Sequence, residues 1–164
     1  MNLCRSIINQ QISNKAGAAI FLRFKNLFNQ NKVTPNNYLK LKAEKVREAG
    51  LSQTKLSYIK DLAEKFIKKE VDVYKLKNLS SEEIIFELTK VKGIGVWTAE
   101  MFLMNSLGRE DIFSYGDLGL KNAIKKLYKI ENITREQIEQ IVNKWSPYKS
   151  YASKILWKSL NNEK

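Results

Sequence analysis

The sequence predicts an all-α protein, and three observations support this. Only 2 Pro and 7 Gly interrupt the 164 residues, helix-forming Leu, Ile, Lys, Glu and Ala dominate between them, and apolar residues recur at helical spacing. We expect about ten helices and no strand. Hydrophobic residues make up 43% and charged residues 28%, as in ordinary globular proteins. The length suits one domain, so we expect a single domain over residues 1–164.

Helix starts are marked by capping residues. A Ser, Thr or Asp before the first turn accepts a hydrogen bond from one of its N–H groups, and Ser80 with Glu83 and Thr134 with Gln137 have capping-box spacing. The segment Trp97 to Leu107 is apolar nearly all round, which predicts a central buried helix. In chain order, we expect helices over 2–11, from Ser13 to Phe28, two short ones between Thr34–Pro35 and Gly50, then helices from Ser52, from Ser80, over Trp97–Leu107, from Asp117, from Thr134 and from Ser146–Pro147.

Charge and the missing residue types limit the function. The net charge of +12 favours a polyanion as partner. Because the chain has no His, catalysis would depend on carboxylates, hydroxyls or Lys. Cys4 is the only cysteine, so we expect a buried small hydrophobe and no metal site. Arg5 interrupts the apolar N-terminus and nothing later resembles a membrane span, so we expect a soluble, intracellular protein.

A glycine-containing hairpin is expected at residues 88–99. Gly93 and Gly95 flank Ile94 between two helices. Glycines permit a tight turn and close approach of a ligand, and the second helix offers unpaired N–H groups to an anion such as phosphate. Ile94 would pack in the core, and Lys92 would add positive charge. A purely structural turn is the alternative. No strand precedes the glycines, which excludes a dinucleotide-binding fingerprint.

Several motifs in a fixed order resemble one family. The hairpin resembles the helix-hairpin-helix motif, which binds DNA backbones without reading sequence. The chain as a whole resembles the DNA-3-methyladenine glycosylase II branch of the helix-hairpin-helix DNA glycosylase superfamily, whose fold we therefore expect. The matching segments are Asn9–Ser13, Gly50–Ser52 with Lys55, Gly93–Phe102, Leu107–Phe113, Gly116–Leu120 and Trp145–Tyr151.

By this resemblance Asp117 is the catalytic carboxylate. An aspartate at a helix N-terminus is held ionised by the helix dipole, and a fixed carboxylate stabilises the positive charge that develops on the sugar when an N-glycosidic bond breaks. A simple N-cap is the alternative role. Bifunctional members have a Lys two residues after the second hairpin glycine, where this chain has Trp97. The resemblance therefore implies a monofunctional enzyme without lyase activity.

The resemblance also implies further site residues. Gln11 matches the position whose side chain fills the gap left by a flipped nucleotide, although an ordinary polar helix end is the alternative. An indole suits a cationic alkylated purine, whereas core packing alone would explain Met101 and Leu118. The implied DNA-binding residues are Gly93, Gly95, Lys92, Thr98 and Gln11, and the implied base-pocket residues are Trp97, Met101, Leu118 and Trp157.

The expected function is base excision repair of alkylated DNA. The resemblance implies base flipping and release of 3-methyladenine or 7-methylguanine from double-stranded DNA by a monomer without a required cofactor or metal, in the cytoplasm at the nucleoid, or in a nucleus. The backbone carbonyls of Thr89 and Val91 could hold a monovalent cation, as in some relatives. Relatives have helices before the segment that begins here at Met1, so we expect the usual N-terminal extension to be lacking, in a minimal form, a fragment or a degenerate copy.

Three alternatives stay open at this point. The same fold could act on uracil or mismatched thymine, and a noncatalytic relative could keep the hairpin and the charge to bind DNA. Basic amphipathic helices on a membrane surface would need an exposed apolar face, whereas these apolar stripes are explained by a core.

Overall fold

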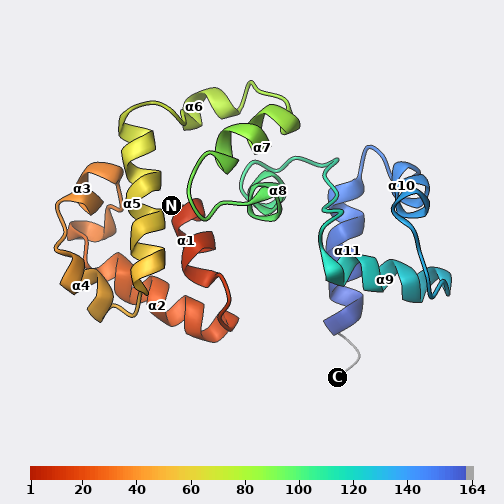
Figure 1. Cartoon of the computed structure of the whole chain (residues 1–164), viewed down its shortest axis with the longest axis horizontal. Helices are drawn as coiled ribbons and strands as arrows, with labels where there is room; N and C mark the ends of the chain where they lie inside the picture. The colour runs from red at the N-terminus through yellow and green to blue at the C-terminus, as the bar shows by residue number, and fades with distance from the viewer. Residues whose placement is uncertain (162–164) are drawn as a thin grey trace. The chain divides into compact units, whose positions relative to one another are not determined.

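The computed structural model describes residues 1–161, with all side chains in that range except those of Val73, Tyr74 and Asn161. Within this range the protein has eleven α-helices, one short 3-10 helix and no strand (Figure 1), which confirms the predicted all-α class. The chain forms two compact units, Met1–Ala99 and Glu100–Lys164. A single domain over residues 1–164 stays a prediction, and each unit is described by itself.

The first unit is organised around its longest helix, α5. Helices α1, α3 and α4 pack against α5 (Figure 1), and α1 also packs against α2. Their shared core includes Ile7, Ile8, Phe24 and Ile59, which are almost fully buried. The helices are α1 (Asn2–Asn9), α2 (Asn14–Asn26), η1 (Asn29–Asn31), α3 (Pro35–Leu39), α4 (Ala43–Glu48), α5 (Gln53–Ile67), α6 (Val73–Leu76) and α7 (Ser81–Thr89).

The predicted caps of this unit are confirmed. Ser13, Thr34 and Ser52 each accept a hydrogen bond from the backbone N–H three residues later, and Ser80 with Glu83 forms the full capping box. The first helix ends at Asn9, before the predicted residue 11. The reason is that Gln10, the C-cap, leaves the helical region with ψ of 133°, and Gln11 then adopts a left-handed conformation with φ of 56°.

The second unit consists of most of α8 (Val96–Asn105), then α9 (Leu118–Tyr128), α10 (Arg135–Asn143) and α11 (Lys149–Asn161). Helix α9 packs against α11 (Figure 1), and Thr134 with Gln137 forms the predicted capping box. The core of this unit contains Phe113, Leu120, Ala123, Ile124, Ile133, Ile138, Val142 and Leu156.

Two predictions for these helices are wrong in detail. The last helix begins at Lys149 instead of after Ser146, because the Ser146 hydroxyl donates to Asp111 Oδ2 (2.7 Å) and the Lys149 N–H donates to Asp111 Oδ1 (3.3 Å). Helix α8 is also not buried all round. Its residues Leu103 and Met104 are buried, but the Trp97 side chain is 50% exposed.

Candidate functional site

Asp117 is held at the N-terminus of α9 by two hydrogen bonds. It is the N-cap of that helix, and its Oδ1 accepts the backbone N–H of Leu120 at 2.9 Å. The same oxygen accepts the indole Nε1–H of Trp157, from α11, at 3.3 Å. The capping prediction is therefore confirmed. The structure brings together the predicted catalytic carboxylate and a predicted pocket residue, and the two donors fix the orientation of the carboxylate.

Gly119 leaves the space in which this pair meets. A Cβ at position 119 would lie 3.0 Å from Asp117 Oδ1 and 3.6 Å from Trp157 Cδ1. Any larger side chain would therefore crowd the carboxylate. Leu118, in the same turn, is 73% exposed. Core packing therefore does not explain Leu118, and its side chain is available to contact a ligand.

Trp97 and Met101 both lie in α8. They are four residues apart, which is the spacing of one helix face. Trp97 is exposed and Met101 is half-buried. Buried apolar side chains occur along α8 from Ala99 to Met104, whereas Val96 and Trp97 at its start are exposed. The apolar character of the helix therefore reflects both core packing and an accessible indole.

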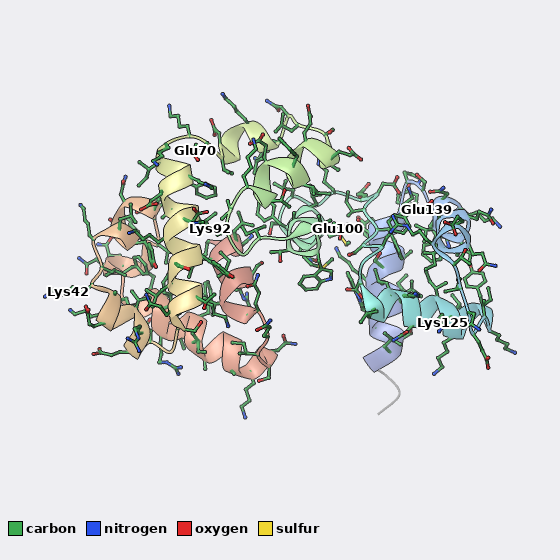
Figure 2. The ribbon with its side chains drawn as sticks, viewed as in Figure 1. Lys42, Glu70, Lys92, Glu100, Lys125 and Glu139 are labelled. Carbon is green, nitrogen blue, oxygen red and sulfur yellow. The ribbon has the colours of Figure 1, made fainter. Side chains whose placement is uncertain are left out.

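A second carboxylate was missed by sequence reasoning. Glu100, on α8 (Figure 2), is 9% exposed, and the fully buried Ser114 donates its hydroxyl hydrogen bond to Glu100 Oε2 at 2.5 Å. The Ser114 carbonyl in turn accepts the N–H of Asp117 at 3.1 Å. Glu100 thus supports the loop that presents Asp117. The one available signal was a single acidic residue in an otherwise apolar helix.

The surroundings of Glu100 favour its protonated form. Burial raises the pKa of Glu100 above its ordinary value, the Ser114 hydrogen bond and the charge of Arg135 oppose this rise, and the charge of Asp117 adds to it. Burial is the largest of these influences, because a buried carboxylate loses its hydration.

The hairpin between α7 and α8 has the predicted geometry. Gly93 has φ of +79°, the Ile94 N–H donates to the Val91 carbonyl at 3.0 Å, and Ile94 is buried in the core. Helix α5 supports this turn at two points. A Cβ at Gly93 would lie 2.0 Å from the Tyr58 ring, and Asp61 Oδ2 accepts the N–H of Lys92 at 2.9 Å.

Gly95 and Thr98 differ in what they can offer to a ligand. Gly95 is exposed, and a Cβ at this position would have no heavy atom within 4 Å, so the fold does not require a glycine there. The absence of a side chain allows a ligand to approach the backbone closely. The side chain of Thr98 is buried, so Thr98 can offer a phosphate only its N–H, in the first turn of α8. Lys92 presents an exposed side chain (Figure 2).

Gln11 lies exposed just beyond the end of α1. Its neighbour Gln10 donates from Nε2 to the carbonyl of Gly93 at 2.7 Å. The structure therefore joins the predicted wedge segment to the hairpin. The predicted site residues divide between the units: Gln11, Lys92, Gly93, Gly95, Trp97 and Thr98 belong to the first, and Met101, Asp117, Leu118 and Trp157 to the second.

Two kinds of feature are absent from residues 1–161. No group of three or more His, Cys, Asp or Glu side chains in this range could hold a metal ion, and no helix there has the length and apolar character to cross a membrane.

Residues 4–147 match the family HhH-GPD, described as the HhH-GPD superfamily of base excision DNA repair proteins. The chain belongs to this superfamily. The match covers both the hairpin of the first unit and Asp117 of the second, which confirms the family resemblance and the predicted helix-hairpin-helix glycosylase fold.

Individual HhH-GPD relatives are similar over nearly the whole chain. DNA-3-methyladenine glycosylase 1 of Schizosaccharomyces pombe is 34% identical over 160 residues, which cover 96% of this chain and 70% of that protein. The chain spans only 58% of a Bacillus subtilis relative, YfjP, at 30% identity.

Solved structures of HhH-GPD relatives agree with these matches. The crystal structure of a DNA-3-methyladenine glycosidase from Bacillus halodurans has a TM-score of 0.88 at 37% identity, covering 96% of this chain and 73% of that one. The Schizosaccharomyces pombe 3-methyladenine DNA glycosylase Mag1, in complex with abasic DNA, has a TM-score of 0.83 at 34% identity, covering 96% and 78%.

Proposed function

We propose that this protein is a monofunctional DNA glycosylase that releases alkylated purines, such as 3-methyladenine and 7-methylguanine, from double-stranded DNA at the start of base excision repair. The observation that carries the proposal is the Asp117 carboxylate, fixed by Leu120 N–H and the Trp157 indole in a chain of the HhH-GPD superfamily. Relatives named as 3-methyladenine glycosylases favour alkylated purines over uracil or mismatched thymine as substrates.

The chemistry assigned to Asp117 is electrostatic. Breaking the bond between base and sugar builds positive charge on the sugar, and a carboxylate that is already oriented stabilises this charge without reorganisation in the transition state. Asp117 also orients, or takes a proton from, the attacking water. An alkylated purine already carries positive charge and leaves readily, so one carboxylate suffices. Trp97 replaces the nucleophilic Lys of bifunctional members, so no covalent intermediate with the strand forms.

The remaining site residues bind DNA and the flipped base. The first-turn N–H groups of α8 and the exposed Lys92 contact backbone phosphates, with Gly93 and Gly95 allowing close approach. Gln11 fills the gap in the duplex. An indole offers a stacking surface to a cationic base. The residues assigned to base contact are Trp97, Met101, Leu118 and Trp157, and those assigned to DNA contact are Gln11, Lys92, Gly93, Gly95 and Thr98.

We assign no required cofactor. The carbonyls of Thr89 and Val91 are the candidate ligands of a monovalent cation beside the hairpin. The Val91 carbonyl already accepts the Ile94 N–H and has a second lone pair for such an ion. We propose that the protein acts as a monomer in the compartment that contains the cellular DNA.

The proposal is tested by base release from methylated duplex DNA. Asp117→Asn is the sharpest variant, because Asn keeps the N-cap and an oxygen acceptor while it removes the charge. We expect release by the wild type and a loss of about 10²–10³-fold in the variant, with strand nicking only after mild alkali. Salt-sensitive DNA binding without base release would contradict the proposal and favour a noncatalytic relative. Strand nicking without alkali would contradict a monofunctional enzyme. Preferred release of uracil or mismatched thymine would show that alkylated purines are not the main substrates.

A further inference from the structure

The end of α1, residues Ile8 to Gln11, has a backbone that needs support. The helix stops at Asn9, and Gln11 then adopts a left-handed conformation with φ of 56°. A residue with a side chain is disfavoured in that region because its Cβ approaches the backbone too closely. Contacts elsewhere must therefore hold the segment in place.

Lys55, on α5, supplies one of these contacts. Its Nζ donates to the Ile8 carbonyl at 2.7 Å and to the Gln10 carbonyl at 2.8 Å. The last carbonyls of a helix lack partners within it, and a positive charge is favourable at a helix C-terminus. Lys55 is partly buried, and this burial lowers its pKa. Its ammonium group is thus committed to the backbone of α1 and is not an ordinary surface charge.

Gln10 supplies the second contact, toward the hairpin. Its Nε2 donates to the Gly93 carbonyl at 2.7 Å. The hairpin is also held by α5, through Tyr58 packed on Gly93 and Asp61 bonded to the Lys92 N–H. Lys55, Tyr58 and Asp61 follow one another at three-residue intervals, so neighbouring positions along α5 support both the end of α1 and the hairpin.

We propose that Lys55 and Gln10 are positioning residues that hold Gln11 at a fixed position relative to the phosphate-binding hairpin. Insertion of Gln11 into the duplex and binding of the hairpin to the DNA backbone then occur as one step. This inference rests on the proposed function, in which Gln11 fills the duplex. A wedge held in place before binding loses less conformational freedom on insertion than a mobile one. Single-stranded DNA has no base stack to fill, so its processing does not need the wedge.

The first test compares two substrates of the same chemistry. Single-turnover base release is measured on one methylated oligonucleotide, as a single strand and as a duplex, with Lys55→Met and Gln10→Leu. The duplex to single-strand rate ratio is expected to fall about tenfold in each variant, corresponding to loss of hydrogen bonds to the backbone. Because both rates come from the same enzyme preparation, a smaller fraction of correctly folded enzyme lowers both equally and leaves the ratio unchanged. Lys55→Arg, which keeps donors and charge, should restore part of the ratio.

Lys60→Met is the matched control, since Lys60 lies on the same helix but is exposed and pairs only loosely with Glu64, at 3.8 Å. Its ratio should equal that of the wild type. Equal loss on both substrates in Lys55→Met and Gln10→Leu would show a merely structural role and overturn the inference.

A second readout does not depend on base release. A duplex with 2-aminopurine beside an abasic-site analogue reports unstacking through its fluorescence, and Lys55→Met should reduce the rise seen with the wild type at saturating protein. An unchanged rise in fluorescence would overturn the inference. If the wild type releases no base from either substrate, the proposed glycosylase function fails, and the fluorescence alone then decides whether Lys55 and Gln10 position Gln11.

Discussion

The two units hold their functional residues in different ways. In the first unit, side chains bind the main chain: Lys55 and Asp61 contact backbone groups of α1 and the hairpin, and Gln10 contacts the carbonyl of Gly93. In the second unit, the proposed functional group is itself a side chain, and Asp117 is oriented by Trp157 and by an N–H of its own helix. Under the proposed function, phosphate binding requires a fixed backbone shape, whereas catalysis requires one oriented carboxylate.

Gly93→Ala should have the largest effect, because it attacks the backbone shape of the first unit directly. The residue has φ of +79°, and a Cβ would lie 2.0 Å from Tyr58, so both strain and overlap oppose the substitution. We expect the free energy of unfolding to fall by about 3 kcal/mol, measured by denaturant titration.

Gly95→Ala is the matched control for this substitution. The site is open in the structure, so the stability should change by less than about 0.5 kcal/mol, while duplex binding weakens because the added methyl group prevents close approach. A Gly93→Ala protein as stable as the wild type would remove the backbone argument for the first unit.

Trp157→Phe should have an intermediate effect and act on catalysis. It keeps an aromatic ring but removes the Nε1–H that donates to Asp117 Oδ1. We expect single-turnover base release to fall about tenfold, because a hydrogen bond to a charged group contributes roughly 1.5 kcal/mol or more, with little change in affinity for undamaged DNA.

Trp145→Phe serves as the control for Trp157→Phe. Trp145 is partly buried against the core of the same unit and packs edge-on against Phe113, with ring centroids 6.0 Å apart. Its substitution should lower stability without selectively slowing base release. Equal rates for Trp157→Phe and the wild type would show that the indole does not orient the carboxylate.

Lys92→Ala should have the smallest effect. The Lys92 N–H keeps its bond to Asp61, so the hairpin retains its shape and only one exposed charge is lost. The slope of log affinity against log salt concentration should decrease in magnitude by about one, measured by fluorescence anisotropy on undamaged duplex. Lys42→Ala, at an exposed position at the start of α4 (Figure 2), should leave the slope unchanged. Indistinguishable slopes for Lys92→Ala and Lys42→Ala would exclude Lys92 from the phosphate contacts.

Local features of this protein could be predicted from sequence, and distant contacts could not. Ser52 and Asp117 accept hydrogen bonds from residues three positions away, so their spacing alone defined two helix starts. The Ser146–Pro147 pattern predicted a helix start equally well, but the Ser146 hydroxyl donates its hydrogen bond to Asp111, 35 residues away. The bond between Lys55 and the end of α1 likewise depends on packing across more than 40 residues. The local geometry was therefore predictable where motif and helix start coincide, at Asp117 and the hairpin, whereas the long-range contacts of Lys55 and Glu100 were not.

The burial of Glu100 couples folding to proton uptake. Because the pKa of Glu100 is raised above its ordinary value of 4.5 in the folded protein, the native state retains a proton that the unfolded chain releases between the two pKa values. The contribution of Glu100 to the free energy of unfolding is therefore fully present below pH 4.5 and is lost as the pH rises through the folded-state pKa. Unfolding in that interval delivers a proton to the buffer, so its measured enthalpy depends on the ionisation heat of the buffer chosen.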